Sequence, residues 1–233
     1  MRVLAVTPLH VDGPELARRQ RRYDRFAPAG VSVRLENLGH GSHIPRALDT
    51  PEDITASEAA VIQRFRNIGD PDLFDAYLPD CVLDPGVGRP LEGIDRPLFG
   101  LLRMSAHFLA GRGGRVGALA RNAAIAAELD RKLVSYGLGL QAGPTAVLGL
   151  SVENIADDQT WARAVDATVC DLRADYVING CSAVDVLTGG GGPLVVDPTA
   201  LALTLLGVPL HADSPTGSQP VSAADDGDRR TCR

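Results

Sequence analysis

Two kinds of hydrophobic pattern alternate along the chain. Short apolar runs of the kind found in buried strands occupy residues 2–7, 31–38, 74–82, 114–120, 145–152, 175–181 and 192–197. Between them, apolar residues recur every three to four positions, which predicts helices over residues 13–27, 50–65, 101–110, 122–137, 159–173 and 198–207. Residues 96–100 are expected to be extended. Strands that alternate with helices favour an α/β fold with parallel sheets covered on both faces.

Several predicted helices carry recognisable start and stop residues. Thr50 is a suitable N-cap, Pro51 suits the first helical position, and two acidic residues follow in the first turn. Asn122 is a suitable cap and Gly137 a suitable stop for the helix over residues 122–137. Pro14 falls in the expected first turn of the helix over residues 13–27. These signals support the predicted order of elements.

Two of the four cysteines stand in matching places. Cys81 lies in "YLPDCVLDPGVG" (residues 77–88) and Cys181 in "YVINGCSAVDVL" (residues 176–187), and each follows a predicted strand and precedes a turn. In parallel sheets the loops after the strands gather at one edge, where open α/β folds bind their ligands. We therefore expect both thiols at a functional edge, where the N-terminal amides of a following helix would favour the thiolate.

The other two cysteines suggest no chemistry. Cys170 lies on the apolar face of a predicted helix with Trp161, Val165 and Val169, and core packing accounts for it. Cys232 belongs to residues 213–233, which are small, polar and predicted to be disordered. The four cysteines form no CxxC pair and no zinc-type spacing, so we expect no structural metal site.

Composition excludes several function classes. The net charge of −6 provides no basic stripe for a nucleic acid. Lys132 is the only lysine, and we expect it on an exposed helix face, which does not favour pyridoxal-phosphate chemistry. The apolar run near the N-terminus is too short for a signal peptide or a membrane span. We therefore expect a cytoplasmic protein with reduced thiols and no membrane partner.

The segments "DCVLDPGVGRPLEGIDRPLFGLLRMSAHFLAGRGGRVGALA" and "ADYVINGCSAVDVLTGGGGPLVVDP" resemble the aspartate/glutamate/hydantoin racemase superfamily, and its hydantoin racemase branch most closely. The resemblance covers residues 73–205. It rests on the DPG after Cys81, the glycine before Cys181 and the return through "PLVVDP". Residues 1–70 agree only in the order of their elements.

The resemblance implies two similar α/β halves related by pseudo-twofold symmetry, with the active site between them. Residues 1–96 and 205–212 would form the half with Cys81, and residues 97–204 the half with Cys181. It also implies no organic cofactor and no metal, and we expect a homo-oligomer.

Each half would then contribute one catalytic cysteine to opposite faces of a substrate carbon next to a carboxylate or cyclic imide. Racemisation removes a proton from one face and returns one to the other, which a single rigid base cannot do. Two thiols in opposite protonation states can act as base and acid. Amides in the turns after the cysteines, at Val82, Leu83 and Ser182, would stabilise the developing enolate.

Several positions depart from the family pattern and suggest a different substrate. Pro8-Leu9-His10 stands where the family usually has Pro-Asn-Thr, so we expect Pro8 and His10 to contact the substrate in another way. Arg121 replaces a threonine and would either hold a carboxylate bidentately or be an exposed arginine at a helix start. Arg103 stands where the hydantoin branch tends to have an acid.

Two further features concern the loops near the site. Pro79 cannot donate to a sheet ladder and is expected to end its strand early, which would change where Cys81 points. His43, together with His40 and Ser42, lies in a polar loop that would supply hydrogen bonds to the substrate.

Two other functions fit the same residues. The scaffold would also suit an arylmalonate-type decarboxylase or a maleate-type isomerase, although decarboxylases of this type tend to use only the later cysteine. Alternatively, the altered turn at residues 8–10 has abolished the chemistry, and the protein is a small-molecule binding module. In that case, both thiols would have ordinary pKa values.

Overall fold

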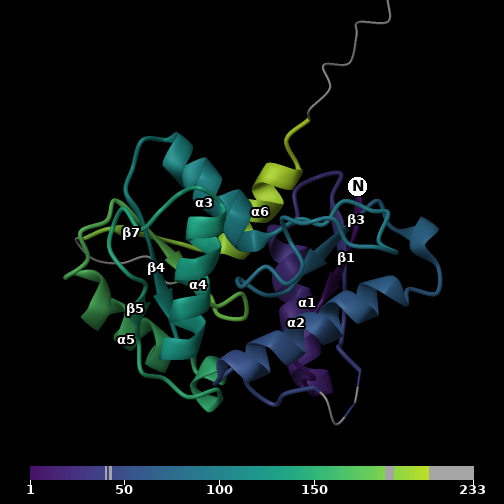
Figure 1. The fold of residues 1–233 in the computed structure, drawn as a ribbon, viewed down its shortest axis with the longest axis horizontal. Helices are drawn as coiled ribbons and strands as arrows, with labels where there is room; N and C mark the ends of the chain where they lie inside the picture. The colour runs from purple at the N-terminus through teal and green to yellow at the C-terminus, as the bar shows by residue number, and fades with distance from the viewer. Residues whose placement is uncertain (40, 42–43, 187–191, 210–233) are drawn as a thin grey trace, which may run out of the picture.

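The computed structural model describes residues 1–39, 41, 44–186 and 192–209. It has two parallel sheets flanked by helices, which lie side by side in Figure 1. The predicted α/β fold class is confirmed. The predicted disordered tail, residues 213–233, lies outside the described residues. No helix in the described part of the chain is long and apolar enough to cross a membrane.

The first sheet has the order β2-β1-β3. Its strands are β1 (Arg2–Val6), β2 (Ser32–Glu36) and β3 (Ala76–Pro79). The connections contain α1 (Gly13–Phe26), α2 (Pro51–Arg66) and the short 3-10 helix η1 (Pro71–Leu73). Leu98, in the segment expected to be extended, forms a single parallel bridge with Tyr77 of β3. This bridge extends the first sheet beyond β3.

The second sheet has the order β5-β4-β6-β7. Its strands are β4 (Val116–Ala120), β5 (Ala146–Val147), β6 (Tyr176–Asn179) and β7 (Leu194–Val196). The helices are α3 (Leu101–Gly111), α4 (Ala123–Ser135), η2 (Glu153–Ala156), α5 (Asp158–Val169) and α6 (Pro198–Leu206). In both sheets the first strand in chain order lies between the next two. The pseudo-twofold relation and the domain boundaries stay predictions.

Apolar side chains from the helices cover both faces of each sheet. Phe65 of α2 packs with Leu4 and Val6, and its ring stacks on Tyr77 with 5.1 Å between ring centres. On the opposite face, α1 and α6 pack on β1. In the second sheet, Trp161 of α5 packs against β4 and β6. The helices α3 and α6 contact each other near the centre of the molecule (Figure 1).

The helix signals in the sequence act as predicted. Thr50 caps α2, where its side chain accepts from the Asp53 amide and the Asp53 carboxylate accepts from the Thr50 amide. Asn122 caps α4 by accepting from the Ile125 amide. Gly137 follows this helix with a φ of 77°, a conformation that glycine adopts without strain.

Two predicted strands are shorter than their apolar runs. The strand expected over residues 74–82 ends at Pro79, at the edge of the first sheet, so Cys81 stands in the turn beyond it. The expected effect of Pro79 on the strand is confirmed. The strand expected over residues 145–152 is regular only at Ala146–Val147, and Gly149 beyond it takes a φ of 67°.

Two expectations about single residues are wrong. Cys170 is exposed and not part of the core, because α5, which carries the apolar face, ends at Val169. Lys132 is buried, not on an exposed face. Its Nζ donates to the Asp84 carbonyl oxygen at 3.0 Å, in the turn after Cys81. This contact bridges 48 residues, and helical periodicity cannot predict it.

Candidate active site

Both cysteines of the matching motifs line one shared cavity. Its walls come mainly from the segments that follow the carboxyl ends of β1, β3, β4 and β6, the edge at which parallel sheets bind ligands. The lining residues are Pro8, Leu9, Arg19, Leu48, Cys81, Val82, Leu83, Arg121, Ile125, Val152, Ile155, Gly180, Cys181, Ser182 and Ala183. Most of these side chains are apolar.

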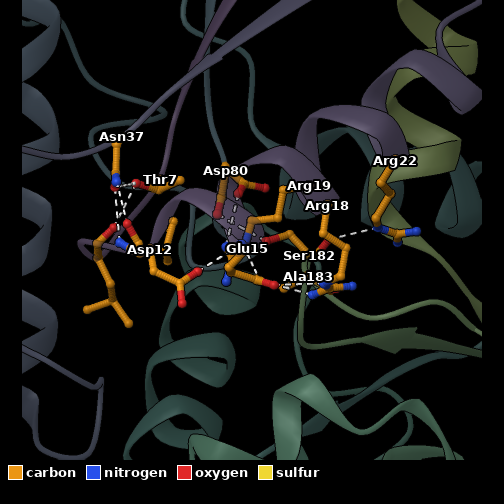
Figure 2. Close-up of polar contacts among 12 residues, drawn as sticks. Thr7, Asp12, Glu15, Arg18, Arg19, Arg22, Asn37, Asp80, Ser182 and Ala183 are labelled. Atoms are coloured by element: carbon orange, nitrogen blue, oxygen red, sulfur yellow. Dashed lines mark hydrogen bonds and ion pairs between the residues drawn. The ribbon is translucent and has the colours of Figure 1, made fainter.

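The turn after β1 is fixed by buried polar side chains. Thr7 donates through Oγ1 to the Leu9 carbonyl oxygen at 2.7 Å, and Figure 2 shows it beside Asn37. Ser57 of α2 donates to the Pro8 carbonyl oxygen at 2.6 Å. These bonds hold Pro8 and Leu9 at the cavity wall.

The turn after Cys81 is held by Asp84. Its amide donates to the Cys81 carbonyl oxygen at 3.1 Å, and its carboxylate accepts from the amides of Leu102 and Arg103 at the start of α3. The Tyr136 hydroxyl donates to the same carboxylate at 2.9 Å. Burial raises the pKa of Asp84 to about 6, although the amide donors oppose this. Asp84 therefore ties the Cys81 turn to α3 and α4.

The turn at Cys181 depends on two residues of β6 and its end. Asn179 donates through Nδ2 to the Cys181 carbonyl oxygen at 3.0 Å and accepts from the Trp161 indole at 3.1 Å. Gly180 lies so close to β4 that an added Cβ would stand 1.9 Å from the Leu119 carbonyl oxygen. Only glycine allows the end of β6 to come this close to β4, and this close contact places Cys181 at the cavity.

The two thiols have similar local geometry and different surroundings. At each cysteine the amide two residues further on favours the thiolate, that of Leu83 at Cys81 and that of Ala183 at Cys181. Burial raises the pKa of the Cys81 thiol to about 12, and Asp80 adds to the increase. Burial also raises the pKa of Cys181, while the Ala183 amide and the Arg19 guanidinium lower it.

Arginines of α1 reach across to the second sheet's turn, as Figure 2 shows. Arg18 donates to the Ala183 carbonyl oxygen at 2.7 Å, and Arg22 donates to that of Ser182 at 3.0 Å. Arg19 donates to the buried carboxylate of Asp80 at 3.1 Å. The Ser182 hydroxyl closes the link by donating to the Asp80 carbonyl oxygen at 3.0 Å. The two cysteine turns are thus joined directly.

Arg121 is buried at the cavity wall, so the alternative of an exposed helix-start arginine is excluded. Its Nη2 donates to the Asp49 carboxylate at 2.8 Å and to the Leu48 carbonyl oxygen at 3.2 Å. Its Nε is buried and has no hydrogen-bond partner. Since Nη2 is occupied, a bidentate grip on a carboxylate through Nε and Nη2 would have to displace Asp49.

The comparisons with known proteins agree with this geometry. The family model described as Asp/Glu/Hydantoin racemase matches residues 25–206, most of the chain. The chain belongs to this family. The family predicted from the sequence motifs is confirmed. No curated protein sequence matches the chain.

Solved structures share the racemase-family fold at low sequence identity. The allantoin racemase from Pseudomonas fluorescens is 17% identical, with a TM-score of 0.71 over 88% of each chain. The allantoin racemase from Klebsiella pneumoniae is 14% identical, with a TM-score of 0.66 over 88% of this chain and 86% of that chain. An unliganded arylmalonate decarboxylase is 15% identical, with a TM-score of 0.53 over 88% of this chain and 92% of that chain. These likenesses show a shared fold.

The structure brings most of the predicted site residues of this family member together. Both cysteines and five of the predicted binding residues line the cavity, the five being Pro8, Val82, Leu83, Arg121 and Ser182. His10 is exposed and contacts the Leu38 carbonyl oxygen at 3.1 Å, and it is not among the described lining residues. His43, with His40 and Ser42, lies outside the described residues.

Three charged residues near the two cysteines were not predicted from the sequence. Arg19 lies in a run of arginines that is typical of a solvated helix face, yet it lines the cavity. Asp80 directly precedes Cys81, and its position in the motif was the available signal for its role. Asp84 belongs to the DPG sequence, which supported the family resemblance without indicating what its carboxylate holds.

Proposed function

We propose that the protein is a cofactor-independent racemase or epimerase in which Cys81 and Cys181 act as acid and base. The observation that carries this proposal is that the two thiols line one cavity, each from a turn after a strand of a different sheet. The family assignment supports an isomerase of this kind. In this proposal, the substrate carbon lies between the two sulfurs.

The proposed reaction is a proton exchange at a carbon next to a carbonyl group. One thiolate removes the proton on its face, and the electron pair of the C–H bond moves into the carbonyl as an enolate. The other thiol then protonates the carbon on the opposite face, giving the other enantiomer. Amides of the two turns would stabilise the enolate oxygen, with Val82 and Ser182 best placed because those of Leu83 and Ala183 face the sulfurs.

The walls of the cavity suggest the substrate class. The mostly apolar lining favours a small ligand with an apolar substituent, and the unpartnered Nε of Arg121 favours a single carbonyl acceptor. Because Asp49 already pairs with Arg121, a neutral cyclic imide fits this position better than a carboxylate. The fold shared with allantoin racemases also supports a hydantoin-type ring.

The proposal is tested by incubating purified protein in deuterium oxide with single enantiomers of allantoin, 5-isopropylhydantoin and aspartate. We expect loss of optical rotation together with deuterium uptake at the stereogenic carbon of at least one cyclic imide, above a buffer control. No exchange on any of these compounds would contradict the proposal. Carbon dioxide release from an arylmalonate would instead support the decarboxylase alternative.

Replacing either cysteine tests the roles of the thiols. We expect Cys81→Ser and Cys181→Ser each to lower the racemisation rate by roughly 10²- to 10⁴-fold, because each removes one proton-transfer group. Polarimetry measures the rate. Cys170→Ser is the matched control, since Cys170 is exposed and is not among the described lining residues, and it should keep the wild-type rate. Full activity in both active-site variants would exclude the two-thiol mechanism.

The expected homo-oligomeric state and cytoplasmic location stay predictions. Light scattering on the purified protein measures the first.

A further inference from the structure

The two cysteine turns contact different sets of charged groups. We propose, on the basis of the proposed function, that Cys181 loses its proton first and is the base in the resting protein, while Cys81 stays protonated and is the acid. The inference rests on the guanidinium groups of α1 at the Cys181 turn and on the buried carboxylates that flank Cys81.

The Cys181 turn is bound by cations. Arg22 and Arg18 each donate to a carbonyl oxygen within two residues of Cys181, and Arg19 shares the cavity wall with it. Figure 2 shows these three arginines in a row beside the labelled Ser182 and Ala183. A guanidinium near a thiolate stabilises the charged form. Both Arg19 and Arg22 favour the Cys181 thiolate, and Asp80 opposes it.

The Cys81 turn is flanked by acids. Asp80 precedes it and is 1% exposed, and Asp84 follows it and is fully buried. Glu58 of α2 and Glu128 of α4 line a second, smaller hollow together with Cys81. Both Asp80 and Asp84 disfavour the Cys81 thiolate, and burial disfavours it most. A thiol in such surroundings keeps its proton.

Many of these charged groups form salt bridges with groups of opposite charge. The salt bridges weaken the difference in charge between the two turns but do not reverse it. Arg19 pairs with Glu15 and Asp80, and Arg22 with Asp185 and Asp197. On the Cys81 side, the salt bridges run from Arg89 to Glu58 and from Arg131 to Glu128, and Lys132 reaches the Asp84 carbonyl oxygen. Arg121 lines the same cavity as both thiols. The surrounding charges therefore still favour the thiolate at Cys181 over that at Cys81.

The assignment states which cysteine removes the proton and which one returns it in the first turnover of the resting protein. The Cys181 thiolate takes the proton from the face of the carbon that it contacts, and the C–H electron pair becomes the enolate. The Cys81 S–H bond then breaks as its proton forms the new C–H bond on the other face. The protein is left with a Cys81 thiolate and a Cys181 thiol, and either proton exchange with water or turnover of the opposite enantiomer restores the resting form.

The test is site-resolved alkylation with iodoacetamide from about pH 6 to about pH 11, followed by mass spectrometry of the two peptides. Only the thiolate reacts, so the pH at half-maximal rate reports ionisation of each cysteine independently of its accessibility. We expect the Cys181 rate to reach its midpoint at least one unit below that of Cys81, whose rate should still be rising at pH 11 because its pKa is about 12. Equal midpoints, or a lower midpoint for Cys81, would overturn the assignment.

Two substitutions give opposite predictions. Arg19→Gln should raise the Cys181 midpoint, and Asp80→Asn should lower the Cys81 midpoint, each by roughly one unit. Arg19→Lys keeps the charge and should retain the wild-type midpoint. Arg25→Gln is the control, because Arg25 lies on the same helix but is half exposed and donates to Asp185 instead of the Ser182 or Ala183 carbonyl oxygen. Far-ultraviolet circular dichroism verifies folding, and unmoved midpoints in folded Arg19→Gln and Asp80→Asn would overturn the assignment.

The outcome is separable from that of the proposed function. Midpoints in the expected order without exchange on any carbon acid would leave the charge assignment intact and contradict the racemase proposal. Racemisation with equal midpoints would support the racemase proposal and contradict the charge assignment.

Discussion

At the scale of single residues, burial sets the chemistry of the site. Cys81 and Cys181 sit in a mostly apolar cavity, and the resulting rise in both thiol pKa values makes each thiolate scarce near neutral pH. A scarce thiolate is also a strong base, because its basicity rises with its pKa. The site therefore suits the removal of a weakly acidic proton from carbon.

The pH dependence of turnover should follow from these directions. The pKa of Cys181 lies above its ordinary value. Below that pKa, the fraction of Cys181 present as thiolate increases about tenfold for each unit by which the pH rises. Cys81, with a pKa of about 12, remains an acid throughout the accessible range. We expect kcat/KM to rise steadily into the alkaline range with no descending limb. A pH–rate profile with subtraction of the uncatalysed rate measures this, and a maximum near neutral pH would contradict it.

Asp84 should make stability depend on pH. Its pKa is about 6 in the folded protein against an ordinary 3.8, so the folded state holds an extra proton between these values. The stabilisation from this group is complete below pH 3.8 and is lost as the pH rises through about 6, a change of about 3 kcal/mol in the free energy of unfolding.

Urea unfolding across this pH range compares wild type with Asp84→Asn. The variant should lack this part of the decline in the free energy of unfolding, because asparagine does not titrate. Asp95→Asn, at an exposed position, should keep the wild-type slope. The same slope in all three proteins would show that Asp84 has an ordinary pKa in the folded protein.

At the scale of the elements, strand ends place the reactive groups. β3 ends at Pro79, so Cys81 lies in the turn that follows the strand. Gly180 allows the end of β6 to contact β4. The segments after the carboxyl ends of β1, β3, β4 and β6 supply most of the cavity wall. Small shifts of one strand end should therefore affect activity strongly.

Gly180→Ala tests this dependence. The added methyl would stand 1.9 Å from the Leu119 carbonyl oxygen, so β6 and Cys181 must move. We expect the free energy of unfolding to fall by about 3 kcal/mol and racemisation to drop at least 10²-fold. Gly111→Ala, at the end of α3 with open space around it, should change the stability by less than about 1 kcal/mol. Thermal unfolding and polarimetry measure both effects, and a wild-type rate for Gly180→Ala would contradict the argument.

At the scale of the whole molecule, α1 links the two sheets. Arg22 is buried and pairs with Asp185 and Asp197 of the second sheet's loops, while α1 itself packs on the first sheet. The Ser182 hydroxyl adds a direct bond to the Asp80 carbonyl oxygen. The cavity between the cysteines depends on these links, because its two walls come from different sheets.

Arg22→Met should weaken this link. It leaves two carboxylates without their shared guanidinium, and we expect a loss of about 3 kcal/mol in the free energy of unfolding. Arg25→Met is the control, since Arg25 also pairs with Asp185 but its side chain is 54% exposed, and its loss should cost less than about 1 kcal/mol. Chemical denaturation distinguishes the two, and equal stabilities would contradict a structural role for Arg22.

Local chemistry in the sequence was sufficient for the α/β class, the order of the elements and several helix ends. Thr50, Asn122, Gly137 and Pro79 each act through neighbouring backbone atoms, so their roles could be predicted from nearby residues alone. The paired settings of Cys81 and Cys181, with the family resemblance, also pointed to the site.

The remaining features of the site are decided by long-range packing and could not be predicted from the sequence. The burial of Lys132 and the reach of the α1 arginines to the Cys181 turn depend on contacts between segments far apart in the chain. Periodicity assigns a face to each side chain, but it does not say which segment covers that face. The charges around each thiol are therefore a property of the folded molecule, because the Coulomb interaction depends on distance in space and not on separation along the chain.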